Sequence, residues 1–207
     1  MSVLPKLASA LGRRDMGPNI KLAEEIAKKG DKKSVKELID ALKNKSKDIQ
    51  NDSIKVLYEI GEKRPELICD YSKEFISLLD DKNNRLQWGA MTALNCIASL
   101  DPKTIYAALS KIISVGENGS VITRDHTVAV LIKLGTIKQY ADNAFAMLNE
   151  QLKKCPTNQL PMYAEKAVPI INAKNKPAFI KTLTSRLDDI DKDTKRKRVE
   201  KVIKVLS

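Results

Sequence analysis

The sequence predicts an all-α fold of stacked helical hairpins. Apolar residues recur at the spacing of one helical face, and no stretch shows the strict alternation of a half-buried strand. Aromatic residues are only 4% of the chain, and eight glycines and eight prolines in 207 residues leave long uninterrupted stretches. Both features favour helices packed through small and aliphatic side chains over a sandwich or barrel.

The apolar pattern itself repeats every 37 residues, in segments that start at Ile49, Leu86, Thr123 and Leu160. With the first residue as offset 0, offsets 0, 4, 7, 8 and 11 lie on one face of a helix at ~100° per residue. Offset 4 is always small, and offsets 7, 8 and 11 are mostly aliphatic. The columns are Ser53, Ala90, Thr127 and Ala164; Val56, Ala93, Val130 and Ala167; Leu57, Leu94, Leu131 and Val168; and Ile60, Ile97, Leu134 and Ile171. A last step of 35 residues continues them as Val199, Val202, Ile203 and Leu206.

A second amphipathic segment precedes each of these helices. These segments span 34–43, 72–80, 105–115, 143–152 and 178–187, and polar breaks rich in Ser, Asp, Asn and Thr separate the partners. Such residues are good helix N-caps. A single helix pair is too small to bury its apolar stripe alone, so the pairs must stack. We expect one domain over 1–207, with repeats at about 31–67, 68–104, 105–140, 141–176 and 177–207 and an N-terminal cap at 1–30.

The repeated second helix resembles that of the HEAT-repeat (ARM-like) α-solenoid family. TRDHTVAVL and LQWGAMTAL match its order of an aliphatic residue, Arg, a small residue and an Ala-Leu pair, with Arg124 at the arginine position. Gln50, Gln87 and Pro161 depart from that arginine. The resemblance covers about residues 17–207 and implies a right-handed superhelical α-solenoid of about five HEAT-like helix pairs with an N-terminal half repeat. The alternative is a globular bundle with accidental periodicity.

The single tryptophan, Trp88, is predicted to point away from the apolar stripe. The stripe centres at about 25° on the helical wheel, whereas offset 2, which Trp88 occupies, lies at about 200°. The resemblance implies that second helices line a concave surface, which would make this face a groove for a protein partner. The partner-binding candidates are Tyr58, Trp88, Met91, Asp125, Ile132 and Met162. The alternative places Trp88 in the core between repeats, with Gly89 either allowing close helix approach or merely tolerated.

The net charge of +11 raises the alternative of nucleic-acid binding. The charge is uneven: residues 46–82 carry 6 Lys and Arg against 9 Asp and Glu, whereas residues 157–207 carry 12 against 6. A continuous basic groove is therefore not expected. The nucleic-acid candidates are Arg124, Lys166, Arg196, Lys197, Lys201 and Lys204. A solvated helix that caps the stack is the preferred explanation of the basic run.

The sequence offers no constellation typical of an enzyme. His126 is the only histidine, and the three cysteines are widely spaced, so neither a metal site nor a disulfide framework is expected. Some HEAT-like proteins are DNA glycosylases that act on alkylated bases, and Trp88, Arg124 and Asp125 invite that comparison. Thr92, however, stands one turn beyond Trp88 where an acid would be needed. We therefore expect a non-enzymatic, cytoplasmic protein-protein interaction scaffold without a cofactor or membrane span.

Overall fold

The structure, a computed structural model, describes residues 2–206 and confirms the all-α prediction. Helices and short 3₁₀ turns account for all the regular secondary structure within these residues. The chain forms two compact units, Met1–Thr127 and Val128–Ser207. The two units are described separately below, and whether the five helix pairs form one domain stays a prediction.

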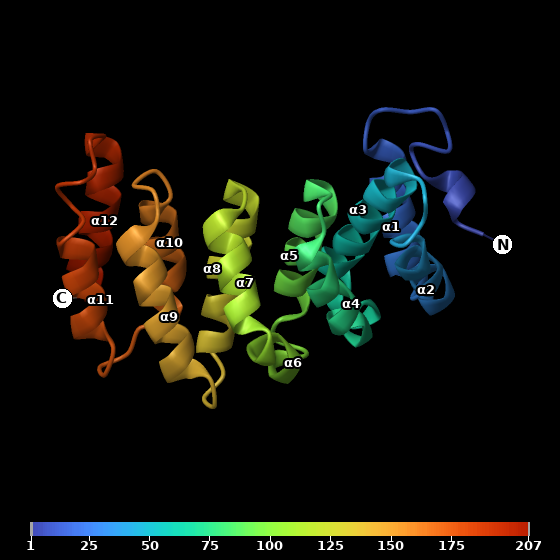
Figure 1. Ribbon diagram of the computed structural model, residues 1–207. Helices are drawn as coiled ribbons and strands as arrows, with labels where there is room; N and C mark the ends of the chain where they lie inside the picture. Colours follow the sequence, from blue (N-terminus) through green and yellow to red (C-terminus); the bar gives the residue numbers. More distant parts are fainter. Residues whose placement is uncertain (1, 207) are drawn as a thin grey trace. The chain divides into compact units, whose positions relative to one another are not determined.

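The first unit consists of two layers of helices (Figure 1). α3 packs between α1 and α5, while α2 covers α3 and α4 covers α5. The helices are α1 (Gly17–Lys29), α2 (Lys32–Ala41), α3 (Lys47–Lys63), α4 (Ser72–Ser77), α5 (Asn84–Ile97), α6 (Pro102–Ala107), α7 (Leu109–Asn118) and the start of α8 (Val121–Gly135). The 3₁₀ turns are η1 (Leu4–Lys6), η2 (Pro65–Leu67), η3 (Cys69–Tyr71) and η4 (Leu78–Asp80).

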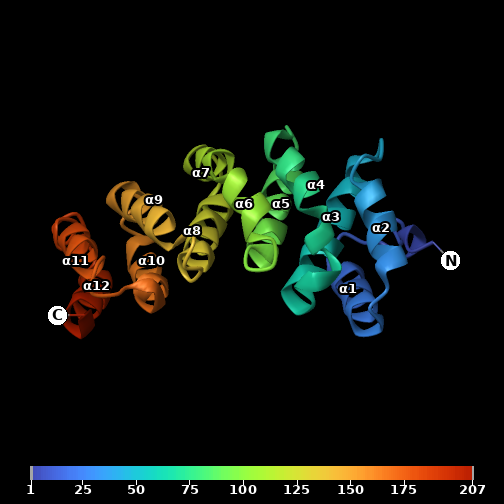
Figure 2. The same ribbon diagram turned by 90° about the horizontal axis from the view of Figure 1, so that it is seen from below.

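The second unit repeats this arrangement. α9 (Ala141–Lys154) packs on α11 (Lys176–Thr184), and α10 (Leu160–Ala167) packs on α12 (Asp193–Leu206). Seen from below, α9 and α11 lie on one side of this unit and α10 and α12 on the other (Figure 2). The short turn η5 (Val168–Ile170) follows α10 directly.

The predicted apolar stripe is the core of both units. All four residues at offset 4 and all four at offset 7 are at most 1% exposed. Ile49 at the start of the pattern and Ile203 and Leu206 at its end are half-buried. In the fourth repeat Val168 and Ile171 are half-buried as well. Pro169 is the cause there, because it cannot continue the hydrogen-bond ladder and α10 ends at Ala167. The helical register that would bury these two side chains is lost there.

One predicted helix is two helices in the structure. The sequence predicts a single element over 105–115, but the backbone of Ala108 adopts φ −95° and ψ 6° and separates α6 from α7. With this break, Ile105, Leu109 and Ile112 are all buried. The turn at Ala108 therefore allows both α6 and α7 to bury their apolar residues.

Side chains cap the helix starts where the sequence provides Ser, Asn or Asp. Ser46 accepts a hydrogen bond from the Ile49 amide at the start of α3, and Asn83 accepts one from the Arg85 amide at the start of α5. Asp31 caps α2, and its hydrogen bonds from the Ser34 side chain and amide hold the pKa of the carboxyl below its ordinary value. These caps satisfy amide groups that the helices themselves leave unpaired.

The buried carboxylate of Asp52 ties the segment before α1 to α3. It is 5% exposed and accepts hydrogen bonds from the Ser9 amide and from Asn19 Nδ2, both at 2.7 Å. Asn19 Oδ1 in turn accepts from the Ala8 amide at 2.9 Å. Leu7 and Ala8 are buried as a result of this docking. Asp52 is thus the polar centre that places the N-terminal segment against α1 and α3.

Gly89 allows α5 to approach α3 closely. A Cβ atom at this position would lie 2.6 Å from Ile54 Cγ1 and 3.2 Å from Ile54 Cγ2. The first distance is too short for any side chain to occupy without movement of the isoleucine. Of the two roles considered for Gly89, the structure supports close helix approach.

Replacement of Asp52 by Ala is expected to lower the free energy of unfolding by about 2 kcal/mol or more, because it leaves two buried donors unpaired. Urea denaturation followed by circular dichroism measures the change. Asp48→Ala, one turn earlier on an exposed side chain, is the matched control and should cost less than ~1 kcal/mol. Equal losses for the two variants would contradict the role assigned to Asp52.

Gly89→Ala is expected to destabilise the protein by ~1–3 kcal/mol, because overpacking against Ile54 outweighs the ~1 kcal/mol that alanine contributes in a helix. Ser114→Ala on the exposed side of α7 is the control for helix propensity alone and should be neutral or stabilising. An increase in the urea midpoint for Gly89→Ala would show that α3 and α5 are not in close contact here.

Candidate partner-binding site

Trp88 lies against Tyr58 on the neighbouring helix. The two ring centroids are 5.7 Å apart with an interplanar angle of 53°, a tilted arrangement that aromatic pairs favour. Tyr58, on α3, is only 7% exposed, whereas Trp88, on α5, is half-buried. Trp88 is therefore neither a core residue nor fully outside: one part of the ring packs on α3 and the rest faces solvent.

Lys55 lies over the ring of Tyr58. Its ammonium lies 4.6 Å from the Tyr58 ring centroid and 2.5 Å from Glu59 Oε1. Burial disfavours the charged form of Lys55, but its interactions with Glu59 and Tyr58 outweigh burial and raise the pKa of the ammonium. Burial also raises the pKa of Tyr58. The tyrosine is thus a neutral, fixed wall of the site.

Two adjoining pockets open on this surface of the first unit. The apolar one has a volume of about 190 Å³ and is lined by Met16, Asn51, Ile54, Lys55, Tyr58, Arg85 and Trp88. The more polar one has a volume of about 410 Å³ and is lined by Ser9, Gly12, Arg13, Arg14, Met16, Asp48, Asn51, Asp52 and Arg85. They adjoin each other, because Met16, Asn51 and Arg85 line both.

The sequence pattern did not reveal several of these lining residues. Arg85 stands three positions before Trp88, so the i, i+3 relation on a helix could have placed it on the same face. Met16 belongs to the segment before α1, and no periodicity connects it to α5. Only the docking of that segment through Asp52 brings Met16 to the pocket.

The prediction that Met91 contacts a partner is corrected by the structure. Its side chain is fully buried, at 0% exposure, and lines neither pocket. On a helical wheel of α5 alone, Met91 lies beside the apolar stripe. In the structure α8 covers this side of α5, since Thr127 Oγ1 lies 3.9 Å from Met91 Sδ. A flank that is open on an isolated helix is closed when neighbours pack on both sides. Met91 is therefore a core residue.

Of the six partner-binding candidates, the structure brings together only Tyr58 and Trp88. Asp125 lies half-buried on α8 and lines neither pocket. Ile132 and Met162 are half-buried residues of the second unit. One further lateral contact joins second helices, because Asn95 Nδ2 on α5 and His126 Nδ1 on α8 are 3.1 Å apart. His126 is thus a partly buried, hydrogen-bonded residue.

Half of the nucleic-acid candidates make contacts within the protein. Arg124 donates to the Glu117 carbonyl at 3.2 Å, Arg196 donates to the Ile190 carbonyl at 3.3 Å, and Lys197 pairs with Asp193 at 2.8 Å. The remaining three, Lys166, Lys201 and Lys204, are exposed. Nucleic-acid contact by these residues stays a prediction.

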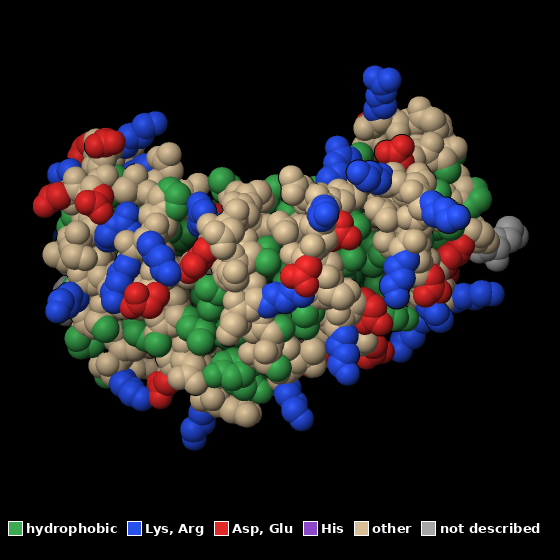
Figure 3. Space-filling view, viewed as in Figure 1, with side chains coloured by type: hydrophobic (Ala, Val, Ile, Leu, Met, Phe, Trp, Pro, Cys, Tyr) green, Lys and Arg blue, Asp and Glu red, His purple; other side chains and the backbone are tan. Residues whose placement is uncertain are grey.

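Another basic residue of α12 also serves the fold. Arg198 holds Glu165 through two hydrogen bonds of 2.6 and 2.8 Å, and these lower the pKa of the Glu165 carboxyl. Over the second unit in Figure 3, blue and red side chains are interspersed rather than gathered by sign. The positive balance of this part of the chain therefore does not form a surface of one sign on the face shown.

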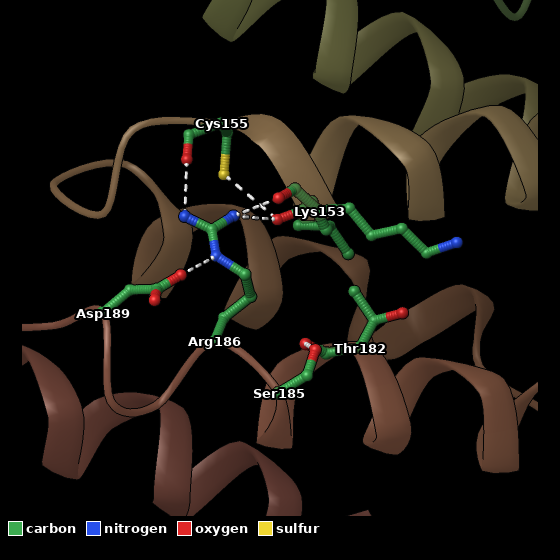
Figure 4. Close-up of polar contacts among 7 residues, drawn as sticks. Lys153, Cys155, Thr182, Ser185, Arg186 and Asp189 are labelled. Atoms are coloured by element: carbon green, nitrogen blue, oxygen red, sulfur yellow. Dashed lines mark hydrogen bonds and ion pairs between the residues drawn. The ribbon is translucent and has the colours of Figure 1, made fainter.

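Arg186 shows how arginine is used structurally in the second unit (Figure 4). Its guanidinium donates to the carbonyls of Leu152 and Lys153, each at 2.7 Å, and of Cys155 at 3.0 Å, and its Nε donates to Asp189 at 2.5 Å. It thereby satisfies carbonyls at the C-terminus of α9, where a cation is favoured. In the first unit, Arg64 does the same for the Ala27 carbonyl of α1 at 3.0 Å.

Within residues 2–206, no three His, Cys, Asp or Glu side chains are grouped so as to hold a metal ion. The described helices also include none that is both long and apolar enough to cross a membrane.

Comparison with solved structures identifies the fold. A designed armadillo repeat protein in complex with the peptide (KR)4 is similar over 100% of both chains, with a TM-score of 0.71 and 16% identity. Computationally designed armadillo repeat proteins for modular peptide recognition match with a TM-score of 0.67 and 15% identity, over 92% of each chain. An engineered protein matches at 0.66 and 18%, over 100% of this chain and 98% of its own.

At the level of sequence, no protein-family model matches, and no curated protein matches significantly. The predicted helical repeat is nevertheless confirmed by these structures, which are armadillo-repeat designs that match over the length of the chain. The chain therefore has an armadillo-like α-helical repeat solenoid fold.

Proposed function

We propose that this protein is a non-enzymatic scaffold that binds a segment of a partner protein at the pocket between α3 and α5. The observation that carries the proposal is the position of Trp88, the only tryptophan of the chain. It is half-exposed, packed on Tyr58, and lines an apolar pocket of about 190 Å³. Tryptophan and tyrosine held on rigid elements are the residues that most often anchor protein interfaces.

The construction of the pocket supports binding of a chain segment rather than of a folded domain. Its volume is below the range of ~300–1,000 Å³ that is usual for small-molecule sites, and it accepts a side chain more readily than a cofactor. It also adjoins the polar pocket, so an extended segment could occupy both. The rigid walls reduce the ordering cost that binding would otherwise incur.

The similar designed proteins are consistent with this proposal. One was solved in complex with a peptide, and others are described as made for modular peptide recognition. Extended to this chain, the same fold would present a series of second helices to a bound segment. In that arrangement Asp125, Ile132 and Met162 remain proposed contacts further along the segment.

Trp88→Ala is expected to abolish selection of binding peptides from a phage-displayed random library, because it removes the largest apolar wall of the pocket. The library is unbiased in charge, so the experiment tests the site without assuming the chemistry of its ligand. Leu100→Ala is the control variant, since Leu100 is 51% exposed but lines neither pocket. Both variants should remain folded by circular dichroism.

Peptides that bind wild type, Leu100→Ala and Trp88→Ala equally would refute the proposed site. Thermal unfolding provides a second check, because loss of the aromatic pair and of partial burial should cost only about 1 to 2 kcal/mol. A loss of ~3 kcal/mol or more would instead show that Trp88 is a core residue.

A further inference from the structure

The two adjoining pockets differ in chemistry. The smaller one presents Trp88, Tyr58, Ile54 and Met16, and is therefore largely apolar. The larger one is bordered by charged groups of both signs. A ligand that occupies both must carry an apolar group next to a polar or charged one.

Half of the six charged residues that line these pockets are already engaged within the protein. The Asp52 carboxylate accepts from the Ser9 amide and Asn19, and is nearly inaccessible at 5% exposure. Arg13 pairs with Asp15 at 2.8 Å, and Lys55 pairs with Glu59 at 2.5 Å. Arg13 and Lys55 are therefore neutralised by carboxylates, and the Asp52 carboxylate, although charged, is too buried to pair with a ligand.

Three charged groups remain available: Arg14, Arg85 and Asp48. Among residues 2–206, neither Arg14 nor Arg85 forms an ion pair, and both are exposed. Asp48 is exposed too, but it lies in the first turn of α3, where the helix dipole favours a carboxylate without any partner. Two exposed guanidinium groups thus line the polar pocket against a single exposed carboxylate.

We infer that the segment bound at this site carries an acidic side chain next to a large apolar one. This inference rests on the proposed function and specifies its ligand. The carboxylate would pair with Arg14 and Arg85, and the apolar side chain would enter the pocket beside Trp88 and Tyr58. Arginine suits this task because its planar fork matches a carboxylate in two parallel hydrogen bonds.

The test uses three capped peptides, acetylated at the N-terminus and amidated at the C-terminus so that only side chains carry charge. The first has the sequence Gly-Glu-Glu-Leu-Phe-Gly, and the other two replace both Glu residues by Gln or by Lys. Because Trp88 is the only tryptophan of the chain and the peptides contain none, its fluorescence reports occupancy of this pocket alone. The Glu peptide should bind about tenfold more tightly than the Gln peptide, and the Lys peptide should bind least.

Arg14→Gln and Arg85→Gln should each weaken binding of the Glu peptide by about threefold to fivefold and leave the Gln peptide unaffected. Lys73→Gln is the matched control, because Lys73 is an exposed cation on α4 that lines neither pocket. Raising the salt concentration should reduce the preference for Glu, since exposed ion pairs are screened.

The outcomes separate this inference from the proposed function. If the Lys peptide saturates the Trp88 signal at lower concentration than the Glu peptide, the site binds peptides but its ligand is basic, and the inference is wrong. Equal binding of the Glu peptide to wild type, Arg14→Gln and Arg85→Gln would contradict the inference as well. If none of the three peptides binds, the inference is also overturned, whereas the random-library selection with Trp88→Ala decides the function independently.

Discussion

The close packing of second helices through small side chains is the constraint on which the rest of this structure depends. No helix pair can bury its apolar stripe alone, so each must contact the next along its length. The small residues at offset 4, such as Ser53 and Ala90, are completely buried. At Gly89 the helices are so close that no Cβ atom fits between α5 and Ile54.

The candidate site is a direct consequence of this packing. Gly89 sets the separation of α3 and α5, and the adjacent residue, Trp88, is thereby placed over Tyr58. The pocket forms on the side of these helices that the stripe does not use. The apolar stripe and the candidate site therefore occupy different faces of the same two helices.

The roles of the individual charged residues cannot be read from the net charge of the chain. Arg64 and Arg186 satisfy carbonyls at helix ends, and Arg198 holds Glu165. These arginines contribute to the excess of +11 but are occupied by the fold. In the proposed mode of binding, the cations that contact a ligand are ones without internal partners, Arg14 and Arg85. Net charge is thus a weak guide to function when arginine also serves as a cap.

Most helices and their buried faces could be predicted from the sequence, because helical periodicity and its 37-residue repeat are local properties of the chain. The break between α6 and α7 at Ala108 could not. Tertiary structure decided which exposed faces stay exposed: α8 closes the flank of α5 and buries Met91. It also decided that Met16 and Arg85 would join Trp88 in one pocket. A helical wheel describes one helix in solvent, whereas these outcomes depend on how neighbouring segments approach it.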